Sequence, residues 1–396
     1  MGRAERRAGT RLRSLLTGLP VLLAAGFLVT SCSSPPKCGN PPQGMVLIVG
    51  AHRNAPAPSL SQRLACQVAG VIRAGKPVLL VVASGQPQLR PLSLPDVNGG
   101  TLAGQGSRVQ AGVQHIQAAI TAARPDSPGA DDLAALAVAA DAARSAGLPH
   151  AELVLLDSGL DDRGALDFTV PGMLGATPSE VAKQLKASSN LPSLDGFTVL
   201  LVSTGYTAPP QTPLPPQWRS KVTRIWATVL MSAGARAEIV PQPAQGASVN
   251  TTQPVKLVPV PATTPVTPGT PTPIVFTGAS PVRFEPDSTA FADPAAAAQA
   301  LKPIARWLAA DPSRHAWLVG TTADVGPMAG QRVLSKLRAD RVRDELVALG
   351  ASPAQISTTG VGSNFPQFTP DRDSSGTLLA GPATLNRSVR ITLRDS

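Results

Sequence analysis

The sequence predicts two folded regions, an α/β region in the middle of the chain and an α+β region at its C-terminal end. Between residues 44 and 241, short apolar, β-branched runs alternate with helical patterns, as in an open parallel sheet covered by helices. Residues 242–275 are rich in Pro and Thr, which is typical of a linker. Residues 276–396 follow the order β-α-β-α-β-β. A chain of 396 residues is long enough for two or three domains.

The first 31 residues have the pattern of a signal peptide and are excluded from the fold. Five Arg residues precede an apolar core, Leu15 to Val29, which is shorter than the roughly 20 residues of a transmembrane helix. The run Val29-Thr30-Ser31-Cys32 resembles the bacterial lipobox. The resemblance implies cleavage before Cys32 and attachment of acyl chains such as palmitate, with residues 32–43 as a tether on the extracytoplasmic face of the cell membrane. An uncleaved signal anchor and a plain signal peptide remain the alternatives.

Composition argues against nucleic-acid binding. Loss of residues 1–31, which carry five Arg and one Glu, lowers the formal net charge from +10 to +6. Aromatic residues make up only 3% of the chain, too few for a platform of stacked bases. A moderately basic chain suits an anionic cell wall or membrane surface instead.

Two cysteines remain besides Cys32. In an exported protein, Cys38 and Cys66 are an even pair that can form one disulfide between the N-terminal segment and the first helix of the middle region. Two separate buried thiols are the alternative. Because the chain has no C-x-x-C pair or Cys/His cluster, no structural zinc site is expected.

The middle region, 44–241, is expected to contain five strands buried on both faces, because its apolar runs are short and β-branched. The strands are predicted at 45–49, 77–83, 153–156, 198–202 and 237–240. The helices are predicted at 60–74, 113–123, 131–146, 179–185 and 218–233. This order, with Leu-Leu-Asp-Ser-Gly at 155–159 after a long helix, resembles a von Willebrand factor A domain or another Rossmann-like α/β domain.

Ligand-binding motifs are scarce in this region. A metal-binding A-domain carries Asp-x-Ser-x-Ser after its first strand, whereas residues 50–54 read Gly-Ala-His-Arg-Asn, so no metal site is expected. Neither G-x-G-x-x-G nor a P-loop is present, so no dinucleotide, nucleoside triphosphate or other cofactor is expected. Asp157, Asp161 and Asp162 cluster at the carboxyl end of a strand. We interpret these acids as residues of solvated turns and helix caps, and His52 as a loop residue whose hydrogen bonds are satisfied. A functional role is the alternative.

The linker, 242–275, contains the run PVKLVPVPATTPVTPGTPTP. Such a sequence favours extended polyproline II and offers too little large apolar surface to form a core. It is therefore predicted to act as a semi-rigid spacer.

The C-terminal region is predicted to begin with a strand that contains Val282 and Phe284. The later strands are predicted at 316–321, 356–360 and 389–393. A helix with Leu301, Ile304 and Leu308 on one face is predicted at 296–309. The loop 363–385, rich in Asp, Ser, Gly and Pro, is predicted to be mobile or to bind a partner.

One strongly periodic helix lies between Gly320 and Gly350. An apolar arc on its helical wheel is predicted to face the core. This arc comprises Leu334, Leu337, Val342, Leu346 and Leu349. Arg338 falls in the middle of the arc, and an unpaired buried charge costs several kcal/mol. Its guanidinium therefore needs a partner, either a ligand carboxylate, which it can hold bidentately, or an acid elsewhere in the domain.

The same stretch resembles the OmpA-like family of peptidoglycan-binding domains. The family's sequence motifs G-H-T-D-x-x-G, N-x-x-L-S-x-x-R-A-x-x-V and N-R-R-V match residues 320–326, 331–342 and 386–389. The resemblance implies that a loop Asp and the helix Arg hold the zwitterionic end of diaminopimelate in the peptidoglycan peptide. The ligand-binding residues implied in this chain are Arg338, Asp324, Thr322, Gln331, Leu334, Asn386 and Arg387.

Three positions depart from the family pattern. Ala323 lies where the loop Asp is expected, so either the adjacent Asp324 substitutes for it or the ligand ammonium is unpaired. Gln331 replaces an Asn and can form similar hydrogen bonds. Ser388 replaces the second Arg of N-R-R-V, which removes one cation from the rim of the site.

The favoured interpretation is a membrane-anchored envelope protein that binds peptidoglycan non-covalently, while its middle domain contacts an envelope protein partner. The alternative is an envelope structural or assembly protein whose OmpA-like domain has lost this binding and mediates protein contacts. An enzyme would need a reactive constellation, and no Ser/His/Asp, Cys/His or paired-carboxylate spacing stands out, so no enzymatic activity is expected.

Overall fold

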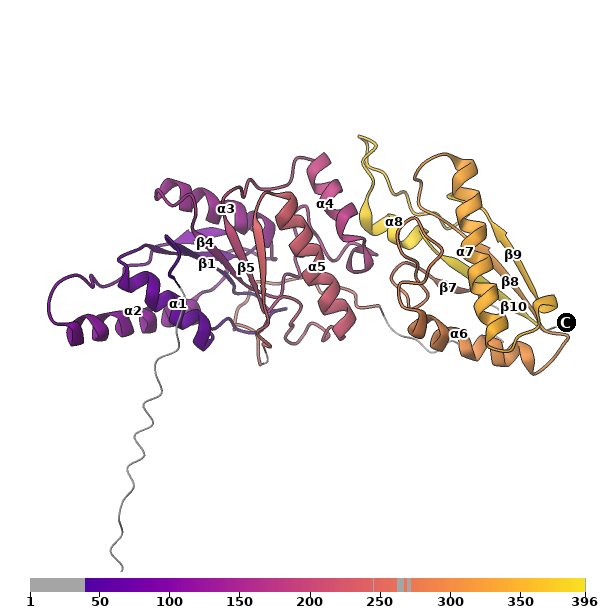
Figure 1. Cartoon of the computed structure of the whole chain (residues 1–396), viewed down its shortest axis with the longest axis horizontal. Helices are drawn as coiled ribbons and strands as arrows, with labels where there is room; N and C mark the ends of the chain where they lie inside the picture. Colours follow the sequence, from indigo (N-terminus) through magenta and orange to yellow (C-terminus); the bar gives the residue numbers. More distant parts are fainter. Residues whose placement is uncertain (1–39, 245, 262–266, 269–271, 396) are drawn as a thin grey trace, which may run out of the picture. The chain divides into compact units, whose positions relative to one another are not determined.

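The computed structural model describes residues 40–244, 246–261, 267–268 and 272–395 (Figure 1). The predicted signal peptide 1–31, the lipidation site Cys32 and the disulfide partner Cys38 lie outside these residues. The described residues form a mixed α/β structure with two sheets, as predicted.

The first sheet has six strands in the order β3-β2-β1-β4-β5-β6. The strands are β1 (Met45–Gly50), β2 (Val78–Ala83), β3 (Gln88–Arg90), β4 (Glu152–Leu156), β5 (Thr198–Val202) and β6 (Arg236–Val240). All neighbouring pairs are parallel except β2 and β3. The predicted open parallel sheet is confirmed, and β3 is an addition at its edge.

Helices cover both faces of this sheet because its strands are apolar on both sides (Figure 1). The helices are α1 (Gln62–Arg73), α2 (Leu102–Ala122), α3 (Asp132–Ser145), α4 (Pro178–Ala187) and α5 (Pro216–Ser232), with a 3₁₀ turn η1 (Met173–Gly175). Side chains of β1 alternate between the two cores: Val46 and Ile48 pack with α3, α4 and α5. Met45, Leu47 and Val49 pack with α1 and α2.

Part of the predicted spacer packs against the middle domain. Val249 and Val258 are buried. The Val258 amide donates to Gln211 Oε1 at 2.8 Å, and the Lys256 amide donates to Asp162 Oδ2 at 2.5 Å. These two valines anchor a segment whose Pro-rich composition indicated an extended linker.

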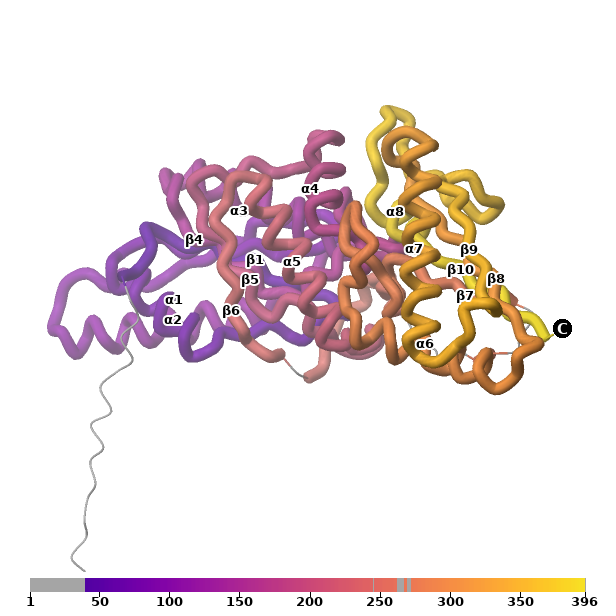
Figure 2. The backbone as a smooth tube through the Cα atoms, turned by 45° about the vertical axis from the view of Figure 1, so that its right-hand side comes forward, coloured from indigo at the N-terminus to yellow at the C-terminus, as the bar shows by residue number. Residues whose placement is uncertain are grey.

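The second sheet has four strands in the order β7-β10-β8-β9. The strands are β7 (Ile274–Phe276), β8 (His315–Gly320), β9 (Ile356–Gly360) and β10 (Val389–Arg394). The helices of this region are α6 (Pro294–Ala309), α7 (Met328–Ala348) and α8 (Ala380–Asn386), with a 3₁₀ turn η2 (Pro353–Gln355). Figure 2 shows α7 beside the strands β8 and β9, which it contacts.

The prediction of a first strand through Val282 and Phe284 is wrong. The edge strand is β7, which begins inside the predicted linker, and Phe284 forms only an isolated bridge with Phe291. Val282 and Phe284 nevertheless pack into the C-terminal core, so their apolar alternation reflects burial rather than sheet pairing. Likewise, the predicted loop 363–385 ends in the short helix α8.

The predicted apolar arc of α7 is partly wrong. Val342, Leu346 and Arg338 are buried as predicted, but Leu337 is 49% exposed, and Ser335 and Ala339 lie on the buried face. Small residues and two glycines explain this. A Cβ on Gly320 would lie 1.9 Å from the Ser335 carbonyl oxygen, and one on Gly360 would lie 2.2 Å from the Lys336 amide nitrogen. The helix therefore approaches β8 and β9 through its small-residue face rather than through its leucines.

Candidate functional site

Arg338 is buried, and its partners are backbone carbonyls rather than an acid. The side chain extends from α7, and the residue is 4% exposed. Its Nε donates to the Ser288 carbonyl at 3.0 Å, and the guanidinium lies 5.2 Å from the centre of the Phe284 ring. Across the described residues, no carboxylate lies within ion-pair distance of this guanidinium.

The environment of Arg338 disfavours its charge. Burial, followed by the nearby Arg387, lowers the pKa of Arg338 to about 10, and the Asp287 carboxylate opposes this change. The group remains cationic at neutral pH. A buried cation without an anionic partner is a candidate site for an external anion.

Arg338 lines a pocket of about 210 Å³. Other charged residues on its wall are Glu180, Lys221, Arg224, Arg283, Glu285, Asp287 and Arg387. Cations outnumber acids there, so the pocket suits a ligand with a carboxylate. The acids provide a place for an ammonium group.

The loop 285–288 forms one side of this pocket. The Arg338 guanidinium donates to carbonyls of this loop, to Ser288 at 3.0 Å and to Glu285 at 3.5 Å. Asp287 has a φ of 49°, in the left-handed region that non-glycine residues rarely occupy. Residues in this region concentrate at binding sites, and Asp287 lies on the pocket wall.

Arg387 lines the same pocket but already has an acidic partner. Its Nη1 and Nη2 atoms lie 2.8 Å and 2.6 Å from the two carboxylate oxygens of Glu180 in α4. Arg338 and Arg387 thus line one pocket, and of these two residues Arg338 is the one without a carboxylate partner in the described part of the chain.

Asp324 lies in a different cluster. Its Oδ1 accepts from Gln331 Nε2 at 3.0 Å, and its amide donates to Asp371 Oδ2 at 3.0 Å. Its Oδ2 lies 3.6 Å from Arg372 Nε, and its side chain is 48% exposed. Asp324 is absent from the wall of the Arg338 pocket. A different acid, Asp287, which follows the predicted first strand, lines it.

Of the remaining predicted ligand-binding residues, Asn386 and Gln331 support the loops around Asp324. Asn386 is buried, and its Nδ2 donates to Asp371 Oδ2 at 2.9 Å. Gln331 accepts from the Ser363 amide at 3.0 Å. Thr322 is buried with its Oγ1 unpaired, and Leu334 is half-buried on α7. None of these four residues lines the Arg338 pocket.

Sequence reasoning missed the contribution of the middle domain to this pocket. Glu180 lies in α4, and Lys221 and Arg224 lie in α5. Burial, together with Arg224 and Arg283, lowers the pKa of Lys221 to about 8. These residues lie more than 100 positions before Arg338 in the sequence and belong to no local motif.

The interpretation of the acidic cluster in the middle domain as solvated is wrong. Asp157, Asp161 and Asp162 are buried, as is His52. His52 Nε2 lies 2.5 Å from Asp157 Oδ2. Burial lowers the pKa of His52, but the charge and hydrogen bond of Asp157 outweigh it and raise the pKa above the usual value. Segments distant in sequence contact these acids, since amides of residues 130, 132, 133 and 256 donate to Asp161 and Asp162, whereas single-sequence reasoning places the acids in exposed turns.

Cys66 in α1 is disulfide-bonded. This agrees with the prediction that Cys66 takes part in a disulfide. Its predicted partner, Cys38, lies outside the described residues. Within the described part of the chain, no helix is both long enough and apolar enough to cross a membrane.

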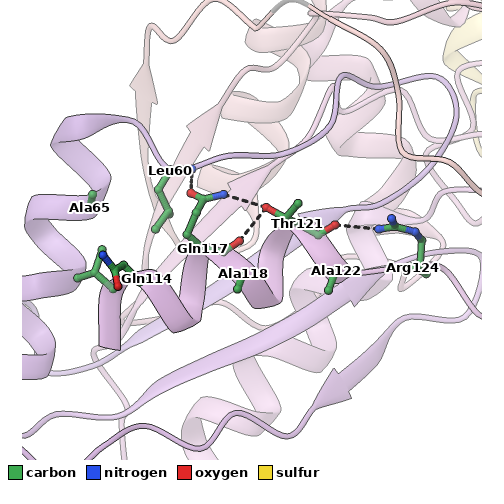
Figure 3. A pocket seen from close by; sticks show the side chains of 9 residues that line it. Leu60, Ala65, Gln114, Gln117, Ala118, Thr121, Ala122 and Arg124 are labelled. Atoms are coloured by element: carbon green, nitrogen blue, oxygen red, sulfur yellow. Dashed lines mark hydrogen bonds between the residues drawn. The ribbon is translucent and has the colours of Figure 1, made fainter. Parts of the chain in front are cut away.

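A groove of about 720 Å³ runs between the start of α1 and the helix α2 (Figure 3). Gln117 accepts from the Leu60 amide at 2.9 Å and donates to Thr121 Oγ1 at 3.1 Å. Arg124 donates to the Thr121 carbonyl at 2.8 Å. Because these polar groups are paired with one another, we assign the groove no ligand.

Comparisons with known proteins concern the C-terminal region. Residues 283–376 match the model of the OmpA family, which confirms the predicted OmpA-like domain. A search of curated proteins found no match. Matching solved structures include the peptidoglycan-associated lipoprotein from Burkholderia pseudomallei, at 26% identity over 28% of this chain and 88% of that chain, with a TM-score of 0.24.

Two other solved structures match the same part of the fold. The periplasmic domain of Helicobacter pylori MotB is 20% identical over 32% of this chain and 78% of that chain, with a TM-score of 0.26. The OmpA-like domain of FopA1 from Francisella tularensis is 15% identical over 32% of this chain and 84% of that chain, with a TM-score of 0.22.

Proposed function

We propose that this chain, which carries an OmpA family domain at residues 283–376, is a cell-envelope protein that binds peptidoglycan non-covalently. The ligand is the diaminopimelate-containing peptide, and its carboxylate pairs with Arg338. One observation carries the proposal: Arg338 is buried at a pocket of about 210 Å³ and has no acidic partner among the described residues.

The pocket chemistry supports a zwitterionic ligand. The planar Arg338 guanidinium is suited to a carboxylate, and the carbonyls of Ser288 and Glu285 hold it in place. Asp287 lies on the same wall and is close enough to oppose the fall in the Arg338 pKa. We therefore assign the ligand ammonium to Asp287 rather than to Asp324, whose carboxylate is occupied by Gln331 and Arg372.

The proposal includes a membrane anchor at Cys32, which would place the protein on the extracytoplasmic face of the cell membrane. The signal pattern of residues 1–31 supports it. The middle domain would contact an envelope protein partner. The proposed role is one of binding and includes no catalytic step.

A test is recovery of the full chain, purified in detergent, with sedimented peptidoglycan. Arg338→Ala is expected to lower recovery at least tenfold. Arg343→Ala is the matched control, because Arg343 lies on the same helix but pairs with Asp344 at 2.8 Å and is absent from the pocket. Equal recovery of wild type and Arg338→Ala would remove the proposed site.

The second candidate is an assembly protein whose C-terminal domain contacts proteins. The Glu180–Arg387 ion pair favours it, because a protein carboxylate already pairs with one cation of the pocket. Ala323, which is buried at the position of the family's loop Asp, also favours this candidate. A diaminopimelate peptide that leaves the melting temperature of the full chain unchanged, together with capture of a defined envelope protein, would support this alternative.

A further inference from the structure

A His and several carboxylates are buried where β1 meets β4. The strand order places β1 and β4 side by side at the point where the winding of the sheet reverses. His52 follows β1, Asp157 follows β4, and Asp132 begins α3. Their exposed fractions are 1%, 2% and 0%. These side chains therefore meet at the carboxyl edge of the sheet, away from solvent.

No backbone N–H group donates to the Asp132 carboxylate. Its hydrogen-bond partner is the Asp157 carboxyl group, so the two groups share a proton, and burial raises the pKa of Asp132 well above its usual value. One ligand atom from each of His52, Asp132 and Asp157 lies within 4.8 Å of the other two. Two buried carboxylates side by side need either a shared proton or a bound cation between them.

The neighbouring acids differ in this respect. Asp161 accepts from the Asp132 amide at 3.0 Å, and Asp162 accepts from the Ala130 and Lys256 amides at 2.6 Å and 2.5 Å. Backbone amides thus satisfy Asp161 and Asp162, and neither joins the three-residue group. Among the described residues, no Lys or Arg forms an ion pair with Asp132 or Asp157.

We propose that His52, Asp132 and Asp157 bind one divalent transition-metal ion of the Zn²⁺ or Mn²⁺ class. One imidazole nitrogen and two carboxylate oxygens are donors that suit these ions. The ion would replace the proton between His52 Nε2 and Asp157 Oδ2, and these atoms would separate from 2.5 Å to about 3 Å. The Asp-x-Ser-x-Ser motif is not needed, because the donors come from three separate segments.

One local feature fits such a site. A Cβ on Gly50 would lie 2.1 Å from Asp157 Oδ2, so the glycine gives this carboxylate room beside β1.

The test measures metal content and affinity on the full chain in detergent. After treatment with EDTA, the protein is titrated with Zn²⁺ and with Mn²⁺, and bound metal is counted by inductively coupled plasma mass spectrometry. We expect one ion per chain for wild type and affinity at least 100-fold weaker for Asp132→Asn. Asp162→Asn, a buried acid outside the set, is the control and should change affinity less than threefold. Absence of a bound ion in wild type would overturn the proposal.

Two further readouts keep the test independent of how well the variant folds. Co²⁺ added to wild type should give visible absorption bands of a nitrogen- and oxygen-ligated ion, which excess Zn²⁺ removes. Saturating Zn²⁺ should raise the melting temperature of wild type by several degrees and leave that of Asp132→Asn unchanged. A wild-type chain with no shift and no bands, alongside a more stable Asp132→Asn, would show that a shared proton holds these carboxylates.

Discussion

Glu180 of α4 and Arg387, the residue after α8, form a bidentate ion pair with N–O distances of 2.6 Å and 2.8 Å. Both side chains are 21% exposed, so solvent screens the pair only in part. The pair joins the middle domain to a predicted ligand-binding residue. A carboxylate of the protein therefore holds the Arg387 guanidinium in the way expected of a ligand carboxylate.

Replacing Glu180 by Gln is expected to strengthen binding of a diaminopimelate-containing peptide about 3- to 10-fold. The reason is that Arg387 becomes available to the ligand, at a gain of roughly 1 kcal/mol. Isothermal titration calorimetry on the full chain measures this. Glu238→Gln is the control, because Glu238 pairs with the exposed Arg236 and is absent from the pocket. Weaker binding by Glu180→Gln would show that Glu180 orients Arg387 for the ligand.

Replacing Arg338 by Met should separate binding from stability. Binding of the peptide is expected to be lost, whereas the free energy of unfolding should stay within about 1 kcal/mol of wild type or increase, since a buried charge without an acidic partner is removed. Chemical denaturation of the full chain gives the second quantity. A loss of 3 kcal/mol or more would contradict this account and assign Arg338 a structural role.

Lys221 makes stability depend on pH in the alkaline range. Its folded-state pKa, about 8, is below its ordinary value of 10.5. The unfolded chain therefore binds more protons between these values, so stability should rise from pH 8 to pH 10.5, by at most about 3 kcal/mol. The rise should be smaller in Lys221→Met and unchanged in Lys183→Met, which alters an exposed residue of α4. Equal profiles for wild type and Lys221→Met would exclude a lowered pKa for Lys221.

Gly320 sets how closely α7 packs on β8. Gly320→Ala is expected to destabilise the C-terminal domain by about 3 kcal/mol or more, because its Cβ would lie 1.9 Å from the Ser335 carbonyl oxygen. Gly330→Ala is the matched control within α7, where no atom lies within 4 Å of an added Cβ. It should raise stability by up to about 1 kcal/mol through helix propensity. Urea unfolding followed by circular dichroism compares the two; equal effects would contradict the close packing.

Much of the middle sheet was predictable because its strands are buried on both faces. The five predicted strands all appear within one residue at each end, and Thr198–Val202 matches at both ends. By contrast, Gln88–Arg90 is short and largely exposed, so it gives no apolar signal. The first turns of α2 contain Gly104 and Gly106, which hid the start of that helix.

The candidate site was predictable only in part. Arg338 and Arg387 were identified by their match to the family's sequence motifs, and both line one pocket in the structure. The role of Glu180 depends on contacts distant in sequence, which local patterns do not encode. The helical wheel also placed Leu337 on the buried face of α7, where it does not lie. Ser335 and Ala339 form that face instead and allow α7 to pack closer to the sheet than leucines would.

The most direct test of the central claim observes the Arg338 guanidinium itself. The Nε–H signal of Arg338 is followed by NMR while the full chain is titrated with a diaminopimelate-containing peptide, and then with the same peptide amidated at the diaminopimelate carboxyl group. We predict a saturable shift of this signal with the free carboxylate and at least tenfold weaker binding of the amidated peptide. Binding of both peptides with equal affinity, and with the Arg338 signal unmoved, would contradict the assignment of Arg338 as the carboxylate site.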